Sequence, residues 1–339
     1  MSKSVGNVID PQKVMQTLGA DIIRLWVSST DYRGEMSVSD EILNRMSDSY
    51  RRIRNTLRFL LSNLSGFNPV TDLLPAEEML ALDRWVVDRA LQLQQDIRKA
   101  YDDFQFHLIY HKLHNFCVVE LGGFYLDIIK DRQYTTQPDS VARRSAQTAL
   151  FHIAEAFTRW MAPILSFTAE EIWAQMPGRA HDSVFFATFA DIEPLFAGLA
   201  VSVEETALIA DLTALRGAAL KRIEELRNEK KLGGSLEAEV DLYLDTASAA
   251  RVAACRDELR FFFITSDVRV HDLGSAPAEA LAASLGAAHA KLIVTPTEAA
   301  KCVRCWHHRA DVGANVLHPE LCGRCVSNVD GPGETRTSF

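Results

Sequence analysis

Apolar residues recur three or four positions apart through the first half of the chain, in long stretches separated by short segments that contain glycine or proline. This spacing puts the apolar side chains on one face of a helix and predicts long amphipathic helices. The stretches cover residues 40–64, 77–104, 106–130 and 140–161. Because their apolar faces are wide and their linkers short, we expect them to pack as an up-and-down helical bundle.

Capping residues predict where some of these helices begin. Asp10 precedes a proline, and Ser39 precedes two acidic residues in the first turn of the next helix. Thr168 and Glu171 have the spacing of a capping-box pair, which predicts a short helix starting there. A Gly-Gly pair at 122–123 predicts a close approach between two helices.

The pattern changes after Pro177. A helical stretch over 203–231 is followed by segments that predict strands at 240–244, 261–264, 268–270 and 291–294. The Ala-rich run 276–290 predicts a surface helix or loop. The expected fold is therefore mainly α: a helical bundle, then a small α/β module, then a cysteine-rich C-terminal segment.

Composition limits the classes of function. The chain has 339 residues, 47% of them hydrophobic, and a formal net charge of −9. This balance argues against a protein that coats nucleic acid indiscriminately, although local basic surfaces can still bind RNA. No run of about 18 apolar residues and no signal-peptide pattern occurs, so we expect no membrane insertion and a cytoplasmic location.

The cysteines carry the most specific chemical signal. The six cysteines are too sparse for a disulfide scaffold, and Cys117 and Cys255 are expected to be ordinary buried thiols. The other four form two Cys-x-x-Cys knuckles with sixteen residues between them: Cys302, Cys305, Cys322 and Cys325. Two such turns close a tetrahedral shell, which predicts one structural Zn²⁺ in a zinc-ribbon-like module. A redox dithiol, an iron–sulfur centre, or one of the two histidines after Cys305 replacing a cysteine ligand are the alternatives.

Basic and aromatic residues surround the knuckles, and only two acids occur between Lys301 and Cys325. The group consists of Lys301, Arg304, Trp306, His307, His308, Arg309 and Arg324. A basic ribbon with one aromatic suits RNA, whose bases stack and whose phosphates need neutralisation, and Trp306 and Arg309 are its candidate contacts. The alternative is that Trp306 packs under the zinc turn as an apolar plug.

A second basic surface lies on the helix over 40–64. It carries Arg51, Arg52, Arg54 and Arg58, and no acid occurs between Tyr50 and Leu64. A guanidinium group matches phosphate geometry, so this face is a candidate contact for an RNA backbone. A solvated helix face is the alternative interpretation.

The N-terminal run Met-Ser-Lys-Ser suits polyphosphate chemistry. Ser2 and Ser4 offer hydroxyl donors, and Lys3 can neutralise charge that develops on a phosphate. The alternative is that this run is an unstructured terminus, which can have the same composition.

Taken with the residues that follow it to Trp26, this run resembles the Lys-Met-Ser-Lys-Ser segment of class I aminoacyl-tRNA synthetases, without its first lysine. Further segments resemble the bacterial isoleucyl-tRNA synthetases, in the same order and over essentially the whole chain. These are Tyr-Arg-Gly-Glu-Met-Ser at 32–37, Arg-Arg-Ile-Arg-Asn-Thr at 51–56, Ala-Pro-Ile-Leu-Ser-Phe-Thr at 162–168, and the Cys-x-x-Cys-Trp-His-His run from Cys302.

The resemblance implies a ligase that activates isoleucine with ATP and transfers it to tRNA(Ile). It implies that Ser2, Lys3 and Ser4 belong to the ATP signature loop, and that Lys3 is catalytic through the pyrophosphate side of the transition state. It also implies four parts: the end of a catalytic domain at 1–35, an anticodon-binding helical domain at 36–190, an α/β junction domain at 191–298, and a zinc module at 299–339.

The sequence departs from the family's pattern in one important respect. It contains no His-x-Gly-His tetrapeptide, the nucleotide-binding signature of these enzymes, and no editing domain. We therefore expect the isolated chain to be inactive. A monomer is expected as well. It is interpreted either as the tRNA-binding part of the ligase or as a free-standing tRNA-binding module without catalysis.

Overall fold

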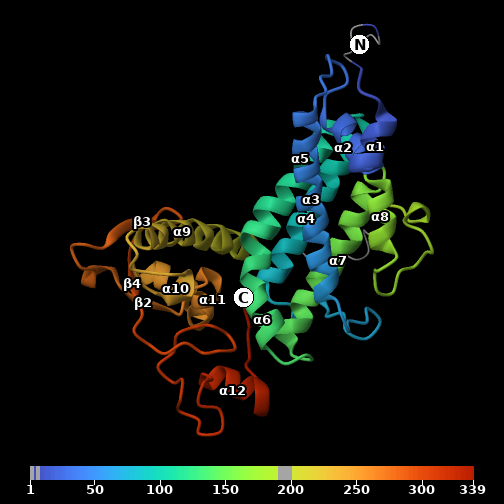
Figure 1. Cartoon of the computed structure of the whole chain (residues 1–339). Helices are drawn as coiled ribbons and strands as arrows, with labels where there is room; N and C mark the ends of the chain where they lie inside the picture. Colours follow the sequence, from blue (N-terminus) through green and yellow to red (C-terminus); the bar gives the residue numbers. More distant parts are fainter. Residues whose placement is uncertain (1–3, 5–7, 190–200) are drawn as a thin grey trace. The chain divides into compact units, whose positions relative to one another are not determined.

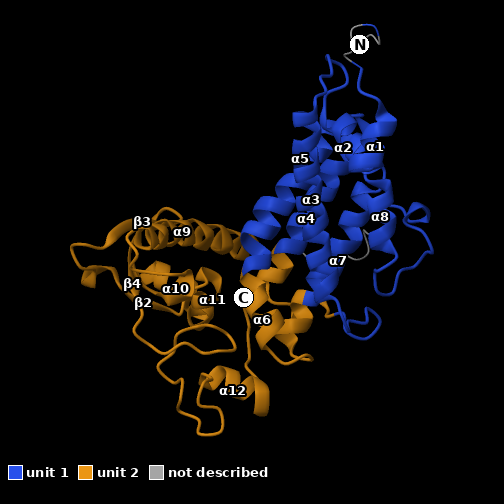
Figure 2. Cartoon of the chain, in the orientation of Figure 1, with its two compact units in different colours: residues 1–73, 86–127, 147–200 blue, residues 74–85, 128–146, 201–339 orange. Residues whose placement is uncertain are grey.

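The computed structural model describes residue 4 and residues 8–189 and 201–339 (Figure 1). The chain divides into two compact units (Figure 2). The first comprises residues 1–73, 86–127 and 147–200, and the second comprises residues 74–85, 128–146 and 201–339.

Helices make up the first unit. They are α1 (Pro11–Leu18), α2 (Ala20–Ser29), α3 (Asp40–Asn63), α5 (Phe106–Asn115), a π-helix (Phe116–Tyr125), α8 (Ser166–Trp173) and a short 3₁₀ turn (Val184–Phe186). Three further helices contribute residues to both units: α4 (Ala81–Asp102), α6 (Leu126–Thr135) and α7 (Val141–Met161). The long helices expected from the apolar spacing are therefore present.

The core of the first unit combines apolar packing with satisfied aromatic donors. Leu57 and Leu60 of α3 are fully buried, as the spacing of apolar residues predicts. Trp160 is also fully buried, and its indole N–H donates to Gln94 Oε1 at 3.0 Å. The Tyr101 hydroxyl donates to the Trp160 carbonyl at 2.7 Å, so α4 and α7 are joined by polar contacts inside an apolar interior.

Two of the predicted helix starts are confirmed and one is wrong. The Asp10 and Ser39 side chains accept from the backbone N–H groups of Gln12 and Ile42, as N-caps do. Thr168 instead lies inside α8, where its hydroxyl and N–H donate to Asp21 Oδ2 at 2.6 and 2.8 Å. The Thr168 hydroxyl therefore bonds a residue on α2, distant in the sequence, and does not cap α8.

The Gly-Gly pair has a different role from the one predicted. Gly122 and Gly123 are exposed within the π-helix rather than pressed against another helix. A Cβ at either position would lie 3.0 Å from a carbonyl oxygen of its own helix, on Cys117 or Val118. The widened π turn itself therefore favours residues without a side chain.

The second unit contains a four-stranded mixed sheet. Its strands are β1 (Ala238–Leu244), β2 (Asp267–Asp272), β3 (Leu281–Leu285) and β4 (Ala288–Pro296), in the order β2-β1-β4-β3. β1 pairs with β2 in parallel, and the β1–β4 and β3–β4 pairs are antiparallel. The long helix α9 (Val203–Asn228) contacts β3 and β4, and residues 240, 242 and 244 of β1 are buried.

Shorter elements complete this unit. They are α10 (Thr246–Val252), α11 (Leu259–Phe263), α12 (Gly323–Asp330), and 3₁₀ turns at Ala76–Glu78, Ser235–Glu237, Ala253–Glu258 and Leu273–Ser275. The observed architecture agrees with the expected mainly α fold with a small α/β module.

Two local predictions in this unit are wrong. Residues 261–263 belong to α11, which ends at Ile264 in the left-handed region (φ 57°), and they do not form a strand. The Ala-rich run 276–290 contains β3 and the start of β4, joined through Gly286 at φ +62°. Fully buried phenylalanines carry no periodicity that separates helix from strand. In the Ala-rich run, the antiparallel pairing of β3 with β4 decides the structure.

None of the helices in the described part of the chain combines the length and apolar character that crossing a bilayer requires.

Candidate zinc centre and nucleic-acid interface

The four cysteines of the two knuckles form one buried cluster. Their sulfur atoms all lie within 4.8 Å of one another, and each residue is at most 7% exposed. Cys305 Sγ and Cys322 Sγ are 3.7 Å apart. Thiolates at about 2.3 Å from a tetrahedral zinc ion lie about 3.8 Å from one another. The cluster therefore has the size and the ligand chemistry of a Cys₄ zinc site.

Local hydrogen bonds shape each knuckle around the sulfurs. In the first, Trp306 N–H donates to the Cys302 carbonyl and Cys302 N–H donates to the His307 carbonyl, each at 2.9 Å. The second begins α12, with Cys322 at the N-cap, and Gly323 N–H donates to Asp311 Oδ2 at 2.9 Å. A Cβ at Gly323 would lie 2.8 Å from that oxygen, so any other residue there would require the Asp311 side chain to shift.

The thiols share their protons unequally. Hydrogen bonds from Cys322 and Cys325 hold the pKa of Cys305 well below its ordinary range. The bond to Cys305 raises the pKa of Cys322 to about 11. Outside the cluster, burial raises the pKa of Cys117 to about 12 and that of Cys255 to about 11, as expected of inert buried thiols.

Each knuckle contains an arginine that points inward rather than toward solvent. Arg304 of the first knuckle donates to the carbonyl of Thr135, at the end of α6, at 2.9 Å. Arg324 of the second donates two hydrogen bonds to the Asp131 carboxylate, also on α6, at 2.6 and 2.8 Å. These two guanidinium groups are therefore engaged by α6 and act as structural anchors.

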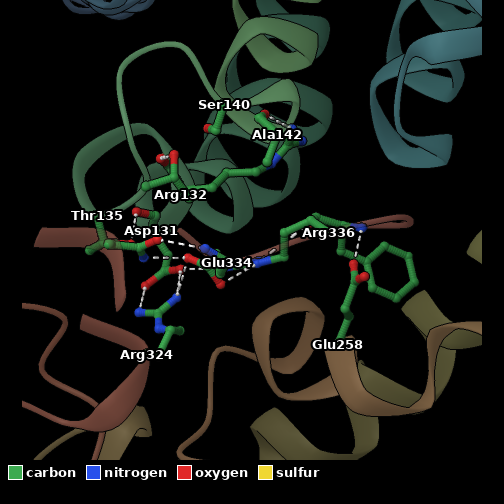
Figure 3. A network of polar contacts seen from close by, with 12 residues as sticks. Asp131, Arg132, Thr135, Ser140, Ala142, Glu258, Arg324, Glu334 and Arg336 are labelled. Atoms are coloured by element: carbon green, nitrogen blue, oxygen red, sulfur yellow. Dashed lines mark hydrogen bonds and ion pairs between the residues drawn. The ribbon is translucent and has the colours of Figure 1, made fainter. Parts of the chain in front are cut away.

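Asp131 is the centre of a larger ionic network (Figure 3). Arg336 Nη2 donates to Asp131 Oδ2 at 2.7 Å, and Glu334 bonds both Arg324 and Arg336. Burial opposes ionisation of Asp131, but Arg324 and Arg336 outweigh it and hold the pKa of Asp131 well below its usual range. The network ties the metal module and the segment near residue 336 to α6. No sequence spacing points to it, because its members come from separate segments.

The segment after α12 is held by a second carboxylate. Glu258 accepts from the N–H groups of Thr337, Ser338 and Phe339 at 2.7, 3.0 and 2.8 Å. The Phe339 ring is buried, 4.8 Å from that of Phe262. No pattern in the sequence indicates a role for these residues.

Trp306 is not the apolar plug of the zinc turn. It is 60% exposed, whereas the next residue, His307, is 4% exposed and lies edge-on to Phe261. The Lys301 ammonium lies 5.4 Å from the Trp306 ring centroid. Trp306 has a φ of 66°, a left-handed conformation that is unfavourable for a bulky residue. An exposed aromatic ring is thus held outward at a cost in backbone energy.

Arg309 is less available for an RNA contact than the sequence suggests. Its guanidinium donates to the Ser266 carbonyl at 3.0 Å and lies 3.4 Å from Asp267 Oδ1, and the side chain is 31% exposed. Arg309 therefore holds the knuckle to the start of β2 as well as presenting charge.

The four arginines of α3 differ in their surroundings. Arg51 pairs with Asp48 at 3.1 Å, and Arg54 lies 3.6 Å from Glu171 of α8. Arg52 and Arg58 are exposed and form no ion pair with any described residue. Asp48 and Glu171, which lie outside residues 50–64, therefore compensate two of these four positive charges.

The signature-loop residues Ser2 and Lys3 lie outside the described residues, and Ser4 is exposed. Downstream of them, Arg24 of α2 donates to the carbonyls of Pro163 and Ile164 at 2.7 Å each. Asp21 and Arg24 together fasten α2 to the segment 163–168 within the first unit.

Comparison with known protein families divides the chain into three matched regions. Residues 1–39 match the family described as tRNA synthetases class I (I, L, M and V). Residues 83–242 match the anticodon-binding domain of tRNA ligase, and residues 300–328 match the zinc finger found in FPG and IleRS.

Curated relatives align over nearly the whole chain. Proteins named isoleucine–tRNA ligase are 57% identical in Saccharophagus degradans, 55% in Azotobacter vinelandii and 59% in Alcanivorax borkumensis. In each case the alignment covers 99% of this chain but 35% of the relative. The chain thus spans about a third of the length of the relatives it matches.

Proposed function

Given that the chain belongs to the family of bacterial isoleucine–tRNA ligases, 35% of whose length it covers, we propose that it is the C-terminal, tRNA-binding part of an enzyme that uses ATP to join isoleucine to tRNA(Ile). The observation that carries this proposal is the pairing of an anticodon-binding helical region with a zinc-finger region that presents an exposed aromatic.

The zinc module is proposed to contribute an RNA contact surface. One Zn²⁺ held by Cys302, Cys305, Cys322 and Cys325 would be structural, because four thiolates leave no open position for chemistry. Its role would be to hold the first knuckle in the shape that carries Trp306 outward. An exposed ring with a neighbouring ammonium at 5.4 Å is suited to stack on an unpaired base and to neutralise a nearby phosphate.

The exposed face of α3 is proposed to contact the phosphate backbone of tRNA. Arg52 and Arg58 are the stronger candidates because no described acid competes for them. Arg51 and Arg54 would have to exchange an exposed carboxylate for a phosphate, and pairs of this kind are worth about 0.2–1 kcal/mol.

Several parts of the proposal rest on the family relationship alone. They are the ATP signature loop at Ser2, Lys3 and Ser4 with Lys3 as a catalytic residue, a monomeric state and a cytoplasmic location. The division at 1–35, 36–190, 191–298 and 299–339 is proposed on the same basis.

Direct binding of tRNA to this chain tests the proposal. Isoleucine tRNA and a non-cognate tRNA should be compared at one fixed salt concentration, because affinities at different salt are not comparable. We expect both to bind and the cognate to bind more tightly. Equal weak binding of both tRNAs, with no difference at any salt concentration, would contradict a role in recognising tRNA(Ile).

A further inference from the structure

A cavity of about 240 Å³ lies beside the cysteine cluster in the second unit. Cys305 and Cys322 form one part of its wall. The rest is mostly basic and consists of Arg260, His307, Arg309 and Arg324, with Asp311 as the one acid.

The arginines of this wall differ in whether they have an acidic partner. Arg324 has Asp131 and Glu334 as partners, and Arg309 has Asp267. Arg260, on α11, forms no ion pair with any described residue, and its buried Nε has no hydrogen-bond acceptor. Its guanidinium lies 4.6 Å from the centroid of the Phe261 ring, which covers one side of the group without neutralising it.

An unpaired guanidinium in such a place is unfavourable. Burial, together with the positive charges of Arg309, Arg324 and Arg336, lowers the pKa of Arg260 to about 10, and Asp267, which pairs with Arg309, offsets this only in part. A buried charge without a partner destabilises a fold unless an opposite charge comes close.

The cysteine cluster would supply that opposite charge once it holds zinc. Four thiolates around one Zn²⁺ leave a net charge of −2, which is then the largest negative charge next to the cavity. A free phosphate would have to enter the same space against this charge and against Asp311. The thiolate centre is therefore a better partner for Arg260 than an external anion.

We infer that Arg260 is a positioning group for the metal: with His307 beside it, Arg260 closes one side of the zinc–thiolate centre, and its guanidinium compensates the negative charge of that centre. His307 is suited to this position because it is 4% exposed; its ring nitrogens have no hydrogen-bond partner among the described residues, and Nδ1 lies 3.8 Å from Asp131 Oδ1. Partners outside the ligand shell stabilise metal sites, and removing one weakens metal binding about 10- to 100-fold.

This inference depends on the zinc site proposed above, and the test separates the two. Arg260→Gln and Arg260→Lys should be prepared in the whole chain, with Lys221→Gln as a matched control because Lys221 is an exposed cation on α9. Zinc content is measured first, followed by zinc affinity in competition with a chromogenic chelator at fixed pH, and by the rate of zinc release.

We expect one zinc per chain in the parent protein. Zinc affinity should fall about 10- to 100-fold in Arg260→Gln, fall less in Arg260→Lys, and remain unchanged in Lys221→Gln. Circular dichroism of the zinc-loaded variants shows whether the fold is retained. If Arg260→Gln does not fold, the lysine variant still tests whether charge at this position holds the metal.

Other outcomes distinguish the possible failures. A parent protein without zinc would remove the metal site itself. Zinc bound with unchanged affinity and release rate in Arg260→Gln would overturn the inference and leave the metal site intact. If that variant instead showed a weaker tRNA affinity and a smaller salt dependence, the cavity would be an RNA phosphate site.

Discussion

Arg324, inside the second cysteine knuckle, and Asp131, on α6, form a two-pronged ion pair at 2.6 and 2.8 Å in which the side chains are 10% and 15% exposed. The two residues are 193 positions apart in the chain. The pair makes the metal module part of the second unit rather than a finger on a free tether, and this relationship motivates the first prediction.

Asp131→Asn should destabilise the second unit by about 1–3 kcal/mol, because Arg324 and Arg336 lose one of their two carboxylate partners and keep only Glu334. Urea unfolding and hydrogen exchange of residues 302–325 would measure the effect. Asp139→Asn is the matched control, since Asp139 is exposed on the same segment. Equal stabilities for the two variants would show that the ion pair contributes nothing net.

The same pair predicts a dependence on pH. Because the pKa of Asp131 lies well below its ordinary range in the folded protein, its stabilising contribution is present above the unfolded pKa of about 3.9. It is lost as pH falls through the lower pKa of the folded state. The stability difference between the parent protein and Asp131→Asn should therefore shrink steadily below about pH 4. A difference that stays constant below about pH 4 while zinc remains bound would contradict this account. Zinc content is measured at each pH, because loss of zinc would unfold the module that contains Arg324 and remove the pair for a different reason.

Removal of the metal should unfold the C-terminal module and leave the first unit folded. Structural zinc contributes about 10–16 kcal/mol in short peptides, far more than the few apolar side chains around the cluster can provide. In Cys302→Ser or Cys325→Ser, residues 301–328 should lose protection from hydrogen exchange. Cys255→Ala, which removes a thiol outside the cluster, should retain one zinc per chain.

Charge removal on α3 should weaken tRNA binding without selecting between tRNAs. In Arg52→Gln/Arg58→Gln the slope of log affinity against log salt should flatten by about one for each arginine that binds a phosphate in the parent protein. Arg33→Gln/Arg179→Gln removes the same charge at exposed positions elsewhere in the first unit and should have a smaller effect. If the α3 variant keeps both its affinity and its salt slope, this face is only solvated surface.

The Trp306→Gly variant should show whether the exposed ring serves the stability of the zinc module or the binding of tRNA. Glycine adopts a φ of 66° without strain, so the module should unfold no more easily, and the strain relieved is about 1 kcal/mol. Removing a stacking ring should weaken tRNA binding by about 1–3 kcal/mol. A variant that is destabilised and binds tRNA normally would show that the ring packs for structure.

The chain by itself should neither activate isoleucine nor charge tRNA. The reason is that its sequence contains no His-x-Gly-His signature for holding the nucleotide. Isoleucine-dependent pyrophosphate exchange by the purified chain, abolished in Lys3→Ala, would contradict this prediction.

The fold and the site were predictable from the sequence where the signal is local. Apolar spacing predicted the long helices, Asp10 and Ser39 predicted helix starts, and the Cys-x-x-Cys pairs predicted one four-cysteine cluster. The helices and their starts depend on residues within about one or two turns of chain, and each cysteine pair forms one tight turn, so backbone spacing alone indicates them.

Predictions were wrong where a distant partner decided the outcome. Thr168 has the spacing of a cap, but Asp21 takes its hydroxyl and N–H. The phenylalanines at 261–263 form a buried helix, and the Ala-rich run contains strands because β3 pairs with β4, so tertiary contacts outweigh weak local preference.

The sequence by itself determined which residues can bind metal, where most helices run, and to which family the chain belongs. Only the tertiary structure decided which charged and aromatic side chains are available to contact RNA or the metal centre. Arg304 and Arg324 face inward, Trp306 faces outward, and Arg260 lies beside the thiolates without a carboxylate partner among the described residues. The physical reason is that neighbours in space decide whether a charged group is paired and whether a ring is exposed. Here those neighbours come from α6, α11 and the segment near residue 336.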